Sequence, residues 1–130
     1  MKILLLVLII IVGLVLLFYL PFYSILLAKS GGIKISIKKI FQYRFDKIPI
    51  SFLIQTTHDL KDALIFVDIE ELVKQYKLGS DIYNIRDGLI EAKNQGLFLT
   101  FEKACLADRS GIDITKTIEN TLKHHVETKD

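Results

Sequence analysis

The two adjacent histidines near the end of the chain are the first candidates for a chemical function. His124 and His125 carry imidazoles, which are common metal ligands. Neighbouring positions on a helix point about 100° apart, and no cysteine or third histidine lies close to this pair in the sequence. We therefore expect a solvated pair and no metal site.

A carboxylate group and a glycine pair are the next candidates. Asp68, Glu70 and Glu71 could form an acidic site, but their spacing is also that of a helix start, where negative charge is favoured. The pair Gly31 and Gly32 lacks the preceding strand, the third glycine and the following helix of a phosphate-binding loop. We interpret the carboxylates as structural and the glycines as a flexible elbow.

Cys105 is the only cysteine, which precludes an internal disulfide and suits a reducing compartment. No histidine and carboxylate accompany it in a recognisable nucleophile pattern. Because free cysteines are commonly buried, we expect a small buried helix residue. With no catalytic, metal or cofactor residue assigned, the sequence predicts a protein that is not an enzyme and that uses no cofactor.

The segment of residues 3–28 carries no charged side chain, and it precedes all of the residues considered so far. As a helix it would extend about 39 Å, against about 30 Å of bilayer hydrocarbon. Pro21 divides it, and residues 3–20 alone would cover about 27 Å. Residues 21–28 either continue the span or lie in the interface. The expected interfacial anchors are the aromatic residues beside the proline: Phe18, Tyr19, Phe22 and Tyr23.

A cleaved secretory signal is the alternative for this segment. Its apolar region would be about 7–15 residues long and would end in small residues. Here the run is longer, and Ile25, Leu26 and Leu27 are bulky. We therefore interpret residues 1–28 as an uncleaved transmembrane anchor.

Basic residues gather directly after the apolar segment, while Lys2 alone precedes it. The expected membrane-surface contacts are Lys29, Lys34, Lys38, Lys39, Arg44 and Lys47. Basic residues beside a span stay on the cytoplasmic side, and each contributes about 1 kcal/mol against anionic headgroups. The pattern predicts a plasma (inner) membrane protein with its N-terminus outside and its C-terminal domain in the cytoplasm. The distal part is net acidic, which argues against nucleic-acid binding.

Residues 33–45 fit two patterns. Ile33, Ile35 and Ile37 alternate with polar residues as in a strand. A longer set falls on one helical face: Ile33, Ile37, Ile40, Phe41 and Phe45. We favour an amphipathic helix lying in the membrane interface, within a basic juxtamembrane segment of residues 29–47.

A faint repeat of 32 residues organises the rest of the chain. Residues 67–72 resemble residues 99–104, and three further pairs match: Gly79 with Gly111, Asp81 with Asp113, and Ile82 with Ile114. Each unit has a helix start at Asp68 or Thr100 and a glycine stop.

Pro49 suits the first turn of a helix that would complete a preceding half unit. The fold prediction is therefore mainly all-α. It consists of a transmembrane helix, an amphipathic helix, a paired-helix domain at 48–125 and a tail at 126–130. The links at 64–67 and 97–99 could form two very short strands.

These features together resemble the N-terminal half of bacterial flotillin-like proteins. The resemblance is carried by residues 29–37 after the anchor, by residues 75–79, by residues 88–92 and by residues 99–104. Departures occur in the family's small-residue turns, which here read Leu78-Gly79-Ser80 and Arg109-Ser110-Gly111. In the family a mixed α/β domain shared with stomatins and prohibitins follows, then a coiled coil, and we expect this chain to end before both.

The resemblance implies a non-enzymatic membrane scaffold, a truncated flotillin-like component that contributes to membrane microdomain organisation. The alternative is a small membrane-tethered adaptor or regulator that binds one partner through an exposed apolar groove. The expected partners are a bilayer with anionic headgroups and a full-length flotillin-like relative. We expect only limited homo-oligomerisation and no nucleic acid.

Overall fold

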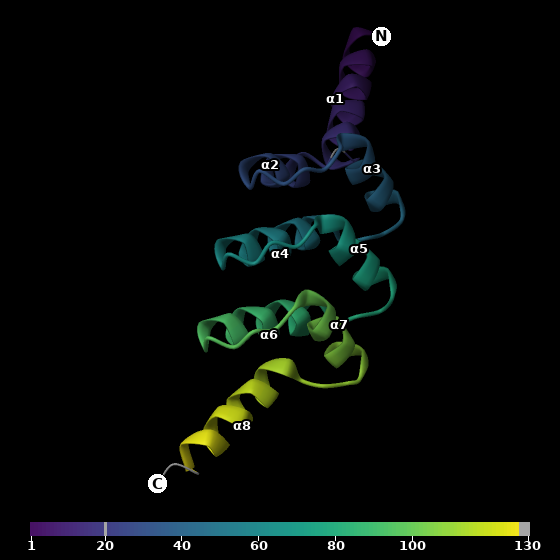
Figure 1. The fold of residues 1–130 in the computed structure, drawn as a ribbon. Coiled ribbons are helices and arrows are strands. Elements are labelled where there is room, and N and C mark those ends of the chain that lie inside the picture. Colours follow the sequence, from purple (N-terminus) through teal and green to yellow (C-terminus); the bar gives the residue numbers. More distant parts are fainter. Residues whose placement is uncertain (20, 128–130) are drawn as a thin grey trace. The chain divides into compact units, whose positions relative to one another are not determined.

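The computed structural model describes residues 1–19 and 21–127, and over these residues the chain is helical with no strand (Figure 1). The helices are α1 (Lys2–Tyr19), α2 (Phe22–Ser30), α3 (Ile37–Phe45), α4 (Ile50–Asp62), α5 (Ile69–Lys77), α6 (Ile82–Asn94), α7 (Phe101–Arg109) and α8 (Ile114–Glu127). The all-α prediction is confirmed. The predicted short strands at 64–67 and 97–99 are wrong for this part of the chain.

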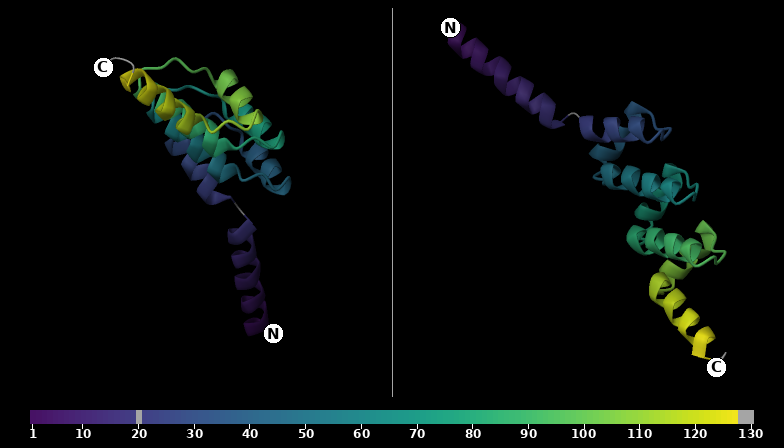
Figure 2. Two further views of the ribbon diagram at one scale, coloured as in Figure 1. Left: turned by 90° about the horizontal axis from the view of Figure 1, so that it is seen from below. Right: turned by 90° about the vertical axis from the view of Figure 1, so that its left-hand side faces the viewer.

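The chain divides into two compact units, Met1–Ile54 and Gln55–Asp130. In the first unit α2 packs against α3. In the second unit α6 lies beside α7 and α8, and α5 also contacts α6 (Figures 1 and 2).

The repeat is regular in the helix boundaries. The helices α3, α5 and α7 begin at Ile37, Ile69 and Phe101, each 32 residues after the last. Their partners α4, α6 and α8 begin with the same spacing, at Ile50, Ile82 and Ile114. The repeat therefore reaches one unit further toward the N-terminus than the sequence comparison indicated, to α2 and α3.

Left-handed residues end the helices with the same period. One series comprises Gly32, Leu64 and Gly96, and the other comprises Lys47, Gly79 and Gly111. Gly79 has φ 82° and Gly111 has φ 74°, which confirms the prediction that both glycines end helices.

These helix ends explain why the links at 64–67 and 97–99 do not pair as β-strands. The Ile65 amide donates to the Leu60 carbonyl at 2.8 Å, and the Leu97 amide donates to the Ala92 carbonyl at 2.8 Å. Such bonds close the last turn of a helix. The backbone donors at the start of each link therefore serve α4 and α6.

The predicted helix starts carry side-chain caps. Asp68 accepts a bond from the Glu70 amide at 2.9 Å, and Thr100 accepts one from the Lys103 amide at 3.3 Å. Each cap satisfies an amide that has no partner within the helix. The carboxylates at the start of α5 thus have the structural position that we expected.

The prediction of a helix over 33–45 is correct only from Ile37 onward. The Ile33 amide bonds to the Ala28 carbonyl at 2.9 Å and so closes α2. Ser36 then holds an extended backbone, with ψ 140°, before α3 begins. Residues 33–36 are needed as a link, so α3 cannot use Ile33 in its apolar face.

The second unit has a close-packed interior. Cys105 is 2% exposed, which confirms that it is a buried helix residue. Gly88 lies in α6 where a β-carbon would come within 2.4 Å of the Ile114 side chain. The backbone of α6 therefore approaches the start of α8 directly.

Candidate membrane-facing surface

The helix α1 has an apolar surface on every side. Its large hydrophobic side chains from Ile3 to Phe18 are all about half exposed or more. Among the described residues, no single helix meets the length and hydropathy criteria for crossing a membrane. The segments Lys2–Phe18 of α1 and Phe22–Ser30, which is α2, are bent by 43° relative to each other and meet these criteria as a pair by length and composition.

Pro21 accounts for the break between these two helices. It precedes α2 with ψ 53°, a non-helical value, and its ring has no amide hydrogen to continue the bonding of α1. The Ile25 amide then bonds to the Pro21 carbonyl at 3.0 Å, which starts α2.

The first unit is held together by the contact of α2 with α3. Ser24 and Ala28 are buried on α2, and Ile40 and Tyr43 are buried on α3. The Ser24 and Ser51 hydroxyls lie 2.6 Å apart. Part of the apolar face expected to meet the membrane is therefore used inside the unit.

The remaining apolar side chains of α3 stay exposed. Ile37 is 55% exposed and Phe45 is 75% exposed, and Phe41 is half-buried. Leu26 on α2 is 70% exposed and was not among the predicted anchors. Its position one turn after Phe22 on a short helix was the available signal.

The predicted anchors are exposed where the structure describes them. Phe18 is 80% exposed, Phe22 is 54% exposed and Tyr23 is 67% exposed. The Tyr19 side chain lies outside the described part of the chain. These rings therefore flank the bend between α1 and α2.

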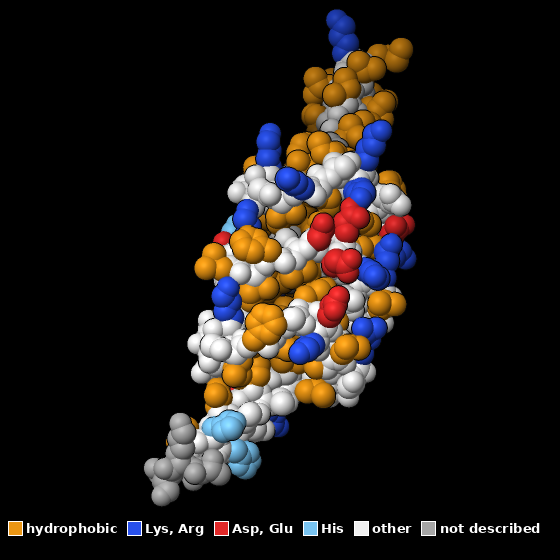
Figure 3. All heavy atoms as spheres, in the orientation of Figure 1, with side chains coloured by type: hydrophobic (Ala, Val, Ile, Leu, Met, Phe, Trp, Pro, Cys, Tyr) orange, Lys and Arg blue, Asp and Glu red, His pale blue; other side chains and the backbone are white. Residues whose placement is uncertain are grey.

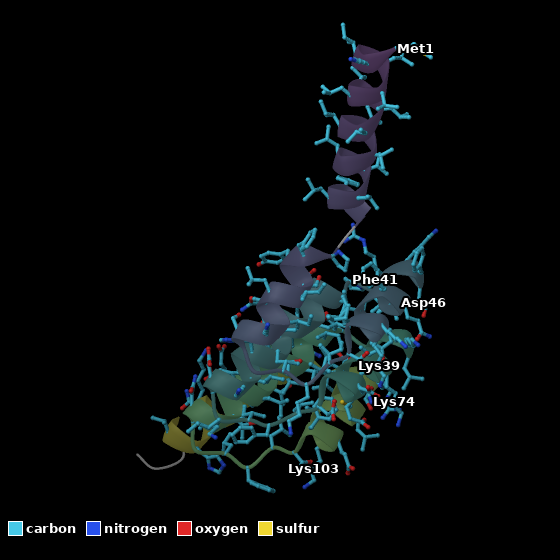
Figure 4. All side chains as sticks on the ribbon, turned by 90° about the horizontal axis from the view of Figure 1, so that it is seen from above. Met1, Lys39, Phe41, Asp46, Lys74 and Lys103 are labelled. Atoms are coloured by element: carbon cyan, nitrogen blue, oxygen red, sulfur yellow. The ribbon has the colours of Figure 1, made fainter. Side chains whose placement is uncertain are left out.

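The predicted basic residues belong to the same unit; Lys and Arg side chains are blue in Figure 3 and all side chains are drawn as sticks in Figure 4. Five of them are exposed, namely Lys29, Lys34, Lys38, Arg44 and Lys47, and Lys39 is half-buried. Lys39, Phe41 and Asp46, labelled in Figure 4, all belong to α3 or its cap. The first unit thus combines an apolar helix with a strongly cationic neighbourhood.

One basic residue connects α3 to the end of α1. The Arg44 Nη2 atom donates to the Phe18 carbonyl at 3.0 Å. Carbonyls in the last turn of a helix have no partner within it, and positive charge there is favoured by the helix dipole. Arg44 therefore fixes the basic helix to the last turn of α1.

The second unit contains an acidic hollow that sequence reasoning missed. It has a volume of about 460 Å³, and four aspartates contribute to its lining: Asp81, Asp87, Asp108 and Asp113. The Asn84 amide nitrogen donates to Asp108 and to the Ile112 carbonyl, both at 2.8 Å, and its oxygen accepts from the Ile114 amide. The only indication of this hollow in the sequence was that Asp81 and Asp113 occupy equivalent positions, 32 residues apart, in the repeat.

This hollow has a structural explanation. Asp108 also accepts from the Asp81 amide at 3.0 Å, so the carboxylate ties the end of α7 to the start of α6. Over the described residues, no group of three or more histidine, cysteine or acidic side chains is arranged to hold a metal ion. His124 and His125 are both exposed on α8.

Comparisons with known proteins give one consistent family. Residues 2–129 match the family described as Flotillin-like protein FloA. A protein of that name from Phocaeicola vulgatus is 26% identical over 109 residues, which are 83% of this chain and 33% of the relative.

Two further relatives of the same name agree. The protein from Dictyoglomus turgidum is 27% identical over 100 residues, covering 76% of this chain and 30% of the relative. That from Opitutus terrae is 27% identical over 121 residues, covering 92% and 36% respectively. The chain thus spans about a third of the length of the curated relatives it matches, and no solved structure matches it.

Proposed function

The chain belongs to the flotillin-like protein FloA family, and we propose that it is a membrane-anchored, non-catalytic scaffold component. The observation that carries the proposal is the first unit, in which an exposed apolar helix adjoins six basic residues. A helix that is apolar on all sides requires a non-aqueous surrounding. The adjoining cations are complementary to anionic lipid headgroups.

In this proposal α1, with or without α2, is the membrane anchor. The aromatic rings of Phe18, Phe22 and Tyr23 occupy the headgroup level, where such side chains are favoured. The basic excess after the anchor supports an orientation with the N-terminus outside and the second unit in the cytoplasm. The protein then belongs to the plasma (inner) membrane.

The proposed role is the organisation of membrane patches together with a full-length flotillin-like relative. The matched segment is about a third of each relative. Any activity that resides in the other two thirds of a relative must be supplied to this chain by a partner or by a longer form of the chain. We therefore propose limited self-association of residues 1–130 and clustering that depends on the relative.

Single-molecule tracking of a fluorescent fusion, with and without the relative, tests this role. A scaffold component should diffuse slowly in patches when the relative is present and freely when it is absent. Free diffusion of single particles in both backgrounds would contradict the scaffold and favour the adaptor. A control fusion carrying residues 1–30 alone separates patch entry from membrane anchoring.

A further inference from the structure

The two links of the second unit carry exposed phenylalanines at equivalent positions. Phe66 is 78% exposed and Phe98 is 89% exposed. Each lies two residues after a left-handed residue, Leu64 or Gly96, so the backbone leaves the preceding helix in the same conformation at both links. With Leu64 and Leu97, which are 67% and 43% exposed, these rings form what we term the link edge.

The link edge is held in place by the backbone. A groove of about 340 Å³ lies along it, with Leu64, Ile65, Leu97 and Phe98 in its lining. The Lys93 ammonium, also in the lining, donates to the Leu64 carbonyl at 2.8 Å and so connects α6 to the preceding link. Because the amides of Ile65 and Leu97 also have partners, the exposed side chains belong to a defined surface.

Basic residues adjoin this apolar edge along the chain. Lys61 and Lys93 occupy the last turns of α4 and α6, one repeat apart. Residues 93–100 contain no acidic side chain. Beside the other link, Asp62 is bonded to the His58 imidazole at 3.1 Å and Asp68 accepts from the Glu70 amide. Exposed phenylalanines beside lysines suit a boundary between headgroups and acyl chains.

We propose that the link edge binds the headgroup region of an anionic lipid bilayer. The proposal rests on the proposed function, because the membrane that holds α1 keeps the second unit at a high effective concentration near lipid. Exposed apolar side chains gathered along one groove, here Leu64, Leu97 and Phe98, mark an interaction surface. The flanking lysines favour an anionic bilayer over a second copy of this chain, whose link edge carries the same positive charges.

A tryptophan at position 98 tests the proposal, since the chain contains no tryptophan. The full chain with Phe98→Trp is reconstituted into vesicles containing one quarter anionic lipid, with acyl chains brominated near the carbonyls. We expect at least twofold quenching relative to unbrominated vesicles and protection from acrylamide. Leu106→Trp, at a 57% exposed position of α7, is the matched control and should show neither effect.

The outcomes separate this proposal from the anchor. Lys61→Gln with Lys93→Gln should reduce the quenching at position 98 while the protein still floats with the vesicles. A floating protein whose position 98 is quenched no more than position 106 overturns the link edge alone. A protein that does not float overturns the edge and the proposed function together. A blue shift that grows with protein concentration in lipid-free detergent would assign the edge to a second copy instead.

Discussion

Leu64 and Gly96 hold the same left-handed backbone position one repeat apart, with φ values of 60° and 68°. Lys47 and Gly79 form a second such pair, with 57° and 82°. A side chain with a β-carbon costs about 1–2 kcal/mol in this conformation. The helix-pair geometry therefore imposes the left-handed turn even where the local residue opposes it.

Replacement of Leu64 by asparagine should stabilise the protein. Asparagine tolerates the left-handed region without the backbone entropy of glycine, so we expect the free energy of unfolding to rise by about 0.5–1 kcal/mol. Leu78→Asn is the control, because Leu78 is similarly exposed but has φ −77°. Denaturant unfolding of the full chain in detergent measures both. An equal gain in the two variants would show that lost surface hydrophobicity, not backbone strain, is responsible.

Gly79→Val and Gly111→Val should destabilise the protein by similar amounts, about 1–2 kcal/mol each. A β-carbon at either glycine meets no atom within 4 Å, so the cost comes from the positive φ and not from a clash. Asparagine at the same positions should cost less than half as much. Clearly different costs at the two sites would mean that the helix ends are not equivalent.

The sequence allowed prediction of the features that depend on local chemistry. The caps at Asp68 and Thr100 and the stops at Gly79 and Gly111 each require a particular residue type, so they could be recognised. The repeat unit that contains α2 and α3 was missed for the same reason. There Lys47 occupies the position of Gly79, and Gly32, at the position of Gly96, was interpreted as an elbow.

Features that leave no trace in hydrophobic periodicity could not be predicted. Whether residues 33–36 extend α3 or close α2 is decided by a local helix-end bond, from the Ile33 amide to the Ala28 carbonyl. The burial of Ile40, which is 1% exposed, likewise removed one residue from the expected membrane face. The positions of the basic residues needed no such contact, because charged side chains remain exposed on most folds.

Gly88→Ala should destabilise the protein although alanine is the better helix former. The added carbon would lie 2.4 Å from Ile114 Cγ2 and 2.6 Å from its Cβ, so α6 and α8 must separate. Overpacking of this kind costs about 1–3 kcal/mol. Ile114→Ala removes Cγ2, and the double variant should be less destabilised than the sum of the single variants. Strict additivity in this double-mutant cycle would show that the cost of the added carbon does not come from Ile114 Cγ2.

Titration of Cys105 should weaken the fold in alkali. Burial raises the pKa of this thiol from its ordinary value of 9.0 to about 11. Because the unfolded chain loses the proton first, the stabilising contribution is complete below pH 9 and is lost as the pH rises toward 11. The difference in unfolding free energy between wild type and Cys105→Ala should therefore shrink across this range. A difference that is constant with pH would contradict the burial argument.

The orientation of the anchor should depend on the basic residues close to it and not on the total charge. A reporter fused after Asp130 should be active only in its cytoplasmic form. Replacement of Lys29, Lys34, Lys38 and Lys39 by glutamine leaves too little positive charge to hold this end inside, so activity of an external reporter should appear.

The matched control removes four distal lysines instead: Lys74, Lys77, Lys103 and Lys116. Basic residues beyond about 15–20 positions from a span have little influence on its orientation, so this variant should keep the wild-type topology. Equal inversion by both sets would show that net charge decides the orientation. Cytoplasmic reporter activity in every variant would mean that the basic first unit does not orient the chain and serves only to contact the lipid surface.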